Sequence, residues 1–210
     1  MVRAIVFDVD GTLIDTEDAV LKSLQQALLE VQGRSRSLDE IRFVLGIPGA
    51  RALPKLGIAP EDVDRVNERW NVFMKDHFDS ISIFPGIMDV LKLLKEKGVP
   101  TGIVTSKTRQ ELEHDFVPFG MMEYLSLVVC ADDTVHHKPH PEPILKWLER
   151  SGAEPNETIY IGDTSYDLEC AQGAGVDFGL AVWGCRNHGE IDYLRRLERP
   201  QEILTLLEEK

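Results

Sequence analysis

The chain has 210 residues, of which 43% are hydrophobic and 28% are charged. This length fits one large domain or a core domain with an insertion, and the composition is that of a globular protein. Lysine and arginine total 23 against 36 acidic residues, which gives a formal net charge of −13 at pH 7. Binding to nucleic acids or to anionic membranes is therefore not expected, because both are negatively charged.

The sequence predicts a protein of the cytoplasm. Its N-terminal segment lacks the charged and then apolar pattern of a signal peptide, and no apolar run approaches the length of a membrane span. Cys130, Cys170 and Cys185 are too few and too widely spaced for a zinc site or a disulfide framework, which fits a reducing compartment. The sequence does not distinguish a monomer from a homodimer.

The first predicted element is a short strand, Ala4–Phe7, that continues into Asp8, Asp10 and Gly11. An apolar run bounded by turn residues is typical of a strand buried on both faces of a parallel sheet. If the strand persists, Asp8 and Asp10 point the same way, because side chains alternate along a strand. Two such carboxylates favour a cation between them, and oxygen ligands suit Mg²⁺. The alternative is that they only end the strand and cap the segment after it.

A helical block is predicted over residues 16–83, with no strand from Thr16 to about Ser82. One helix begins after Thr16 as N-cap, and a second begins with a capping-box pattern at Ser37. A third lies near Ala50–Leu56, and a long one begins at Pro60. Because this block follows the first strand directly, it is expected to form a lid over that strand's carboxyl end.

Strands and helices alternate in the rest of the chain. Further strands are predicted at Pro100–Thr105, Leu125–Ala131, Thr158–Ile161 and Phe178–Val182. Helices are predicted at Gly86–Lys97, around Gln110–Val117, from Pro141 to Gly152, at Ser165–Gly173 and at Pro200–Glu208. This alternation predicts a doubly wound α/β core made of residues 1–15 and 84–210, with residues 16–83 as an inserted helical domain.

Polar side chains follow the second and third predicted strands. Thr105 and Ser106 end the second strand, where a hydroxyl and backbone N–H groups could hold phosphate oxygens. An ordinary helix N-cap is the alternative for this site. Lys138 follows the third strand in a segment stiffened by prolines. There it could neutralise a phosphate and a carboxylate together, although a surface lysine is the alternative.

Two further acids follow the fourth predicted strand. Asp163 lies at its carboxyl end and Asp167 one helical turn beyond. Both could share a cation with Asp8, either directly or through water. Taken singly, Asp163 could be a helix N-cap and Asp167 a surface acid.

Together these groups resemble the motifs of the haloacid dehalogenase superfamily, in the phosphoglycolate-phosphatase-like branch with a small helical cap of the C1 type. The similar segments are DVDGT at Asp8–Thr12, Thr105, Lys138, GDTSYD at Gly162–Asp167, and Val182–Gly184 after the fifth strand. The resemblance covers nearly the whole chain and implies a Rossmann-like core with an inserted cap.

The resemblance also implies roles for these residues. Asp8 would attack phosphorus to give an aspartyl-phosphate, and Asp10 would protonate the leaving oxygen and then activate water. The implied Mg²⁺ site comprises Asp8, the Asp10 carbonyl group and Asp163, with Asp167 close by. The implied phosphate-binding residues are Gly11, Thr12, Thr105, Ser106 and Lys138.

The implied function is that of a Mg²⁺-dependent phosphatase for a small phosphorylated metabolite. Phosphoglycolate is the leading substrate, with a pyrophosphatase of the same branch as an alternative. A β-phosphoglucomutase-like enzyme is another, but such mutases carry a cap-hinge histidine where this chain has Val20. A non-catalytic protein that kept the fold is disfavoured by the intact motifs. In the predicted cap, Arg51 is the candidate for binding an anionic substrate group, or else a solvent-facing arginine.

Overall fold

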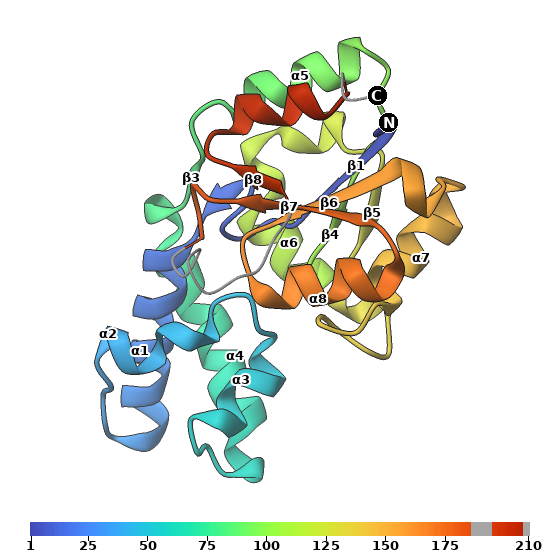
Figure 1. Cartoon of the computed structure of the whole chain (residues 1–210). Helices are drawn as coiled ribbons and strands as arrows, with labels where there is room; N and C mark the ends of the chain where they lie inside the picture. The colour runs from blue at the N-terminus through green and yellow to red at the C-terminus, as the bar shows by residue number, and fades with distance from the viewer. Residues whose placement is uncertain (186–194, 208–210) are drawn as a thin grey trace. The chain divides into compact units, whose positions relative to one another are not determined.

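The computed structural model describes residues 1–185 and 195–207 (Figure 1). The chain divides into two compact units. The first comprises Met1–Asp15 and Ile83–Lys210, and the second comprises Thr16–Ser82. The sequence predicts the return to the first unit at residue 84, one position after the boundary at Ile83.

The first unit is built on a six-stranded sheet with the order β5-β4-β1-β6-β7-β8. Its strands are β1 (Ala4–Phe7), β4 (Thr101–Val104), β5 (Leu127–Val129), β6 (Thr158–Gly162), β7 (Asp177–Ala181) and β8 (Arg195–Leu197). Each neighbouring pair is parallel. All residues of β1, β4 and β6 are buried, as expected for short apolar strands covered on both faces. The predicted doubly wound α/β core is confirmed.

Helices cover both faces of this sheet. They are α5 (Ile87–Glu96), α6 (Arg109–Asp115), α7 (Glu142–Ser151) and α8 (Ser165–Ala174), with 3₁₀ turns at Val117–Phe119, Met121–Tyr124, Ala131–Asp133, Pro155–Glu157 and Pro200–Leu207. Figure 1 shows α7 and α8 on the opposite side of the sheet from α5. The closing helix predicted at Pro200–Glu208 is thus a 3₁₀ helix, and Glu208 lies outside the described residues.

Two strand predictions need correction. β8 is missing from the sequence analysis, because a three-residue edge strand with Arg195 and Arg196 shows no apolar run. β2 (Ile14–Asp15) and β3 (Ser82–Ile83) pair in a separate two-stranded sheet. β3 begins at Ser82, where the predicted strand-free segment ends, and two residues are too few for any alternation to show.

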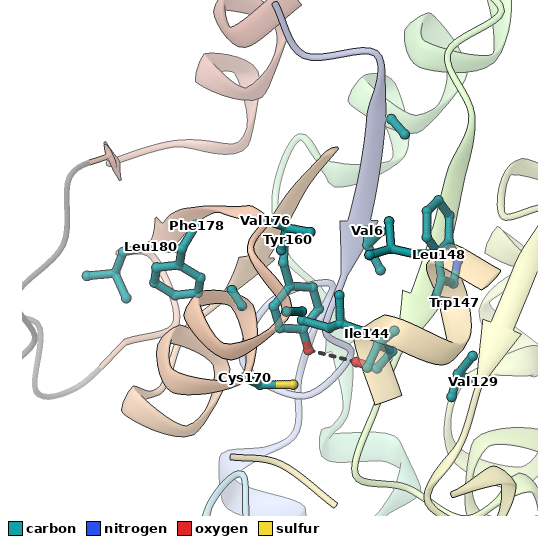
Figure 2. Close-up of a cluster of buried hydrophobic side chains, with 14 of the residues drawn as sticks. Val6, Val129, Ile144, Trp147, Leu148, Tyr160, Cys170, Val176, Phe178 and Leu180 are labelled. Carbon is teal, nitrogen blue, oxygen red and sulfur yellow. Dashed lines mark hydrogen bonds between the residues drawn. The ribbon is translucent and has the colours of Figure 1, made fainter. Parts of the chain in front are cut away.

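A hydrophobic core fills the space between the sheet and helices α7 and α8 (Figure 2). The labelled side chains are Val6, Val129, Ile144, Trp147, Leu148, Tyr160, Cys170, Val176, Phe178 and Leu180. Tyr160 is the polar member of this cluster. Its ring lies within the core, and its hydroxyl donates to the carbonyl oxygen of Val104 at 2.8 Å (dashed line in Figure 2). A buried tyrosine requires such a partner for its hydroxyl group.

The second unit is helical. Its helices are α1 (Glu17–Gln32), α2 (Leu38–Ile41), α3 (Gly49–Lys55) and α4 (Pro60–Asp76), with 3₁₀ turns at Arg42–Val44 and Phe78–Ser80. Helices α1 and α4 pack together, and the indole Nε1 of Trp70 donates to the Val20 carbonyl at 3.1 Å. The capping box at Ser37 is confirmed. Thr16 precedes α1 but makes no side-chain capping bond, since its ψ of 1° is not the extended conformation of an N-cap.

No helix within residues 1–185 and 195–207 has both the length and the apolar character that crossing a membrane requires.

Candidate functional site

The candidate site lies where the carboxyl ends of three adjacent strands meet. Asp8 follows β1, Thr105 follows β4, and Asp163 follows β6. β1 is the strand from which the chain proceeds first toward β4 and β5 and later toward β6, β7 and β8. In open parallel sheets, ligands bind outside the strand ends at this point of reversal. The topology alone therefore brings the predicted residues of the first unit to one edge.

An ion pair between Asp8 and Lys138 stands at the centre of the site. Both side chains are buried, and Lys138 Nζ lies 3.0 Å from Asp8 Oδ1. Burial raises the pKa of Asp8 to about 7 against the opposing effect of Lys138. The carboxylates of Asp167 and Asp10 add to this increase. Burial by itself would lower the pKa of Lys138, but Asp167 and Asp8 outweigh it and raise that pKa, so the ammonium stays charged.

Asp8, Asp163 and Asp167 form an acidic cluster that fits a divalent cation. Each offers a carboxylate oxygen, and these oxygens lie within 4.8 Å of one another. Burial raises the pKa of Asp163 well above its ordinary value, and the charges of Asp167 and Asp8 act in the same direction. A hard cation with oxygen ligands would offset this crowding of negative charge.

Within this cluster, both oxygens of Asp167 are hydrogen-bonded to other groups of the protein. Oδ1 accepts from Lys138 Nζ at 2.6 Å and lies 3.1 Å from the Tyr160 hydroxyl oxygen. Oδ2 accepts from the backbone N–H and the hydroxyl of Thr164, at 3.0 and 2.6 Å, in the capping box of α8. Asp167 therefore orients Lys138, and a cation would compete with hydrogen bonds at both of its oxygens.

Gly11 and Thr12 shape the turn beside Asp163. The backbone of Gly11 has φ of 75°, and a Cβ atom there would lie 2.2 Å from Asp163 Oδ2. The Thr12 hydroxyl donates to Asp163 Oδ1 at 3.2 Å. A Cβ on Gly184 would lie 1.7 Å from the Gly11 carbonyl oxygen, and Trp183 Nε1 donates to the Thr12 carbonyl at 2.9 Å. The segment after β7 thus contacts the turn after β1 through the close approach of Gly184 and the hydrogen bond of the Trp183 indole.

Asp10 has a different lysine partner from Asp8. β1 ends at Phe7, so strand alternation does not set the direction of these two side chains. Asp10 Oδ1 lies 3.2 Å from Lys107 Nζ, whereas Asp8 contacts Lys138. The implied acid–base residue and the implied nucleophile are therefore held by separate cations.

Thr105 is buried at the turn after β4. Its backbone N–H donates to Val129 at 3.1 Å, and its hydroxyl oxygen accepts from the Lys107 N–H at 3.2 Å. The N-cap of α6 is Thr108, in a capping box with Glu111, so the alternative role of Thr105 as that N-cap is wrong. Phosphate binding by Thr105 and by the neighbouring Ser106 stays a prediction.

Arg51 belongs to the second unit, where it lies exposed on α3. Its predicted contact with an anionic substrate group stays a prediction.

Lys107, Asp115 and Tyr160 are the site residues that the sequence analysis missed. The sequence carried a signal for two of these three residues. Lys107 follows β4 as closely as Asp10 follows β1, and Tyr160 places a polar group inside a fully buried strand two residues before Gly162. Asp115 gave no such signal, because its burial depends on how α6 packs.

The comparisons with known proteins identify the family. The model of haloacid dehalogenase-like hydrolases matches residues 5–181. The chain belongs to the haloacid dehalogenase-like hydrolase family. The hydrolase is 29% identical over 212 residues to the pyrophosphatase PpaX of Anoxybacillus flavithermus, covering 98% of this chain and 97% of the relative.

Solved structures resemble the hydrolase over nearly its whole length. A crystal structure from Lactobacillus plantarum, which carries the provisional name phosphoglycolate phosphatase, is 34% identical with a TM-score of 0.91 and covers 98% of this chain and 100% of that chain. CbbY from Rhodobacter sphaeroides, solved with phosphate, is 22% identical with a TM-score of 0.83, covers 97% of this chain and 96% of that chain, and supports the fold alone. The hydrolase is a phosphatase of this superfamily, which confirms the predicted family and enzyme class.

Proposed function

We propose that this phosphatase hydrolyses a small phosphorylated metabolite through an aspartyl-phosphate on Asp8. The observation that carries the proposal is the buried contact of 3.0 Å between Asp8 Oδ1 and Lys138 Nζ, beside the acidic cluster with Asp163. An ammonium group in this position neutralises both the nucleophile and an incoming phosphate. Positioning and charge neutralisation of this kind supply most of the catalysis of phosphoryl transfer.

In the first half-reaction, an oxygen of Asp8 bonds to phosphorus as the bond from phosphorus to the leaving oxygen breaks. Asp10 donates a proton to that leaving oxygen, so the alcohol or phosphate departs in a neutralised form. The Thr105 hydroxyl and Lys138 hold the oxygens of the phosphoryl group during the transfer. A carboxylate nucleophile thereby divides one difficult displacement into two easier ones.

In the second half-reaction, Asp10 takes a proton from water, and the water oxygen attacks phosphorus. The bond between phosphorus and Asp8 breaks, which releases inorganic phosphate and restores both carboxyl groups to their starting forms. Asp10 thus gives and recovers one proton in each turnover, and no other reactant is consumed than the substrate and water.

Mg²⁺ is the proposed cofactor, and it supplies electrostatic stabilisation of the charge on the phosphoryl oxygens. Asp8 and Asp163 would hold it together with the carbonyl group of Asp10, while Asp167 keeps Lys138 in place. The carboxylate spacing and the raised pKa values of Asp8 and Asp163 support this assignment.

Phosphoglycolate is the proposed substrate, in keeping with the provisional name of the Lactobacillus plantarum structure. Pyrophosphate is the second candidate, because relatives that match nearly the whole chain carry the name pyrophosphatase. We place the enzyme in the cytoplasm, where its three buried cysteine thiols would stay reduced.

The test is hydrolysis of p-nitrophenyl phosphate in the presence of Mg²⁺. Asp8→Asn should lower kcat roughly 10³-fold or more, as the loss of an essential nucleophile does. Asp89→Asn, an exposed aspartate of the same unit, is the matched control and should leave kcat unchanged. Equal activity of Asp8→Asn and the unmodified protein would refute the proposal. Comparing kcat/KM for phosphoglycolate and pyrophosphate then identifies the substrate.

A further inference from the structure

A second lysine is buried near the proposed catalytic acids. Lys107 is 8% exposed, and its Nζ lies 3.2 Å from Asp10 Oδ1 and 2.8 Å from Asp115 Oδ2. Asp115, the last residue of α6, is itself buried. Lys107 therefore bridges Asp10, which has a proposed chemical role, and Asp115, which belongs to the scaffold.

Both ends of this arrangement are anchored. The backbone N–H of Lys107 donates to the Thr105 hydroxyl at 3.2 Å, and its carbonyl accepts from the Ala131 N–H at 2.8 Å. On the other side, His114 Nδ1 lies 2.7 Å from Asp115 Oδ1. The backbone of Lys107 and the carboxylate of Asp115 are thus both held by hydrogen bonds. The ammonium group of Lys107 therefore has little freedom to move away from Asp10.

We propose that the Lys107–Asp115 pair is a positioning device that holds Asp10 in the orientation needed for proton transfer; this rests on the proposed function. Lys107 acts through Asp10 and does not itself touch the reacting atoms. Proton transfer needs the carboxyl group within hydrogen-bond reach of the leaving oxygen and of the attacking water. Small misplacements of such a group are costly, so an ion pair that limits its rotation serves both half-reactions.

A purely structural salt bridge explains the arrangement less well. Buried ion pairs often contribute little net stability compared with apolar side chains of similar volume. Asp115 alone would compensate the charge of Lys107, yet the lysine also reaches Asp10, which is only partly buried. The contact with Asp10 is the feature that a scaffold role does not require.

The test uses p-nitrophenyl phosphate, whose leaving group departs without an acid. With Lys107→Met, aspartyl-phosphate should form at nearly the unmodified rate, seen as a burst of one p-nitrophenolate per active site. Hydrolysis of the aspartyl-phosphate should slow, so that steady-state kcat falls at least tenfold. In a double-mutant cycle, Lys107→Met should cost less than twofold in an Asp10→Asn background. Lys107→Arg should recover most of kcat, because it keeps the cation.

Lys146→Met is the matched control, since it removes a half-buried lysine that donates to the Asp133 carbonyl. If Lys107→Met does not fold, Lys107→Met/Asp115→Leu removes both buried charges and is measured in the same way. An unchanged kcat, a joint loss of burst and kcat, or an equal cost in the Asp10→Asn background would each overturn the proposal. Failure of the proposed function would instead appear in the unmodified enzyme, as the absence of an acid-stable phosphoenzyme and of Mg²⁺-dependent turnover.

Discussion

Asp167→Asn should separate the orientation of Lys138 from the binding of the metal ion. The carboxylate of Asp167 is fully buried and accepts hydrogen bonds at both oxygens, including one of 2.6 Å from Lys138. The substitution keeps the shape of the side chain but removes one of the two anions that face Lys138. Asp8 still compensates part of that charge at 3.0 Å.

We expect a loss of about 3 kcal/mol in the free energy of unfolding, the lower end of the range for breaking a buried ion pair. At 2–4 °C per kcal/mol, this corresponds to a decrease in Tm of roughly 6–12 °C. Because Lys138 would be less well oriented toward the phosphoryl group, kcat should fall roughly tenfold, which equals about 1.4 kcal/mol in the barrier.

The decisive assay is the dependence of kcat on Mg²⁺ concentration, measured below the Tm of each variant. For Asp167→Asn, the half-saturating concentration of Mg²⁺ should change by less than about threefold, because Asp167 orients Lys138. For the matched variant Asp163→Asn, it should rise at least roughly tenfold. If the two variants raise it equally, Asp167 is a direct ligand and our assignment is wrong.

Three further predictions concern Tyr160, Gly11 and the two cysteines Cys130 and Cys170. Tyr160→Phe removes a hydroxyl that donates to a backbone carbonyl at 2.8 Å, and urea denaturation should show a loss of about 1–2 kcal/mol in unfolding free energy; an unchanged midpoint would contradict this. Gly11→Ala places a Cβ 2.2 Å from Asp163 Oδ2 at a positive φ. It should therefore raise the Mg²⁺ concentration needed for half-maximal kcat and lower the free energy of unfolding by roughly 1–2 kcal/mol. Gly98→Ala, also at positive φ but in open space, should lower the free energy of unfolding alone. Burial raises the pKa of Cys130 to about 11 and that of Cys170 to about 12, so both thiols stay neutral at pH 8. Alkylation of these thiols in the native protein should be slow at pH 8 and accelerate as the pH rises toward 11. Rapid labelling of either thiol at pH 8 would refute the prediction.

The strands and the motif residues of the first unit could be predicted because local sequence decides them. Short apolar runs mark β1, β4 and β6, and a parallel sheet necessarily gathers the residues that come after them, such as Asp8, Thr105 and Asp163. The backbone path thus explains why residues far apart in the chain could be assigned to one site.

The features that the sequence analysis missed depend on packing. Asp115 pairs with Lys107 only because α6 packs so that its last residue is buried, and no local pattern encodes that. β8 carries two arginines in three residues, so its strand state comes from pairing with β7 and not from its own composition. The sequence places the Tyr160 hydroxyl in a buried strand, but its partner, the Val104 carbonyl group, is known only from the packing.

The position of β1 in the sheet also has a consequence for how the chain is synthesised. This central strand is made first, but its partners β4 and β6 begin at Thr101 and Thr158. On the ribosome, β1 must therefore wait for about half of the chain before its first side is paired and for about three quarters before its second, whereas residues 16–82 make their own contacts earlier. A stalled or truncated product that ends before β6 would present an apolar strand with one open edge, so chaperone dependence should be greatest for nascent chains of that length.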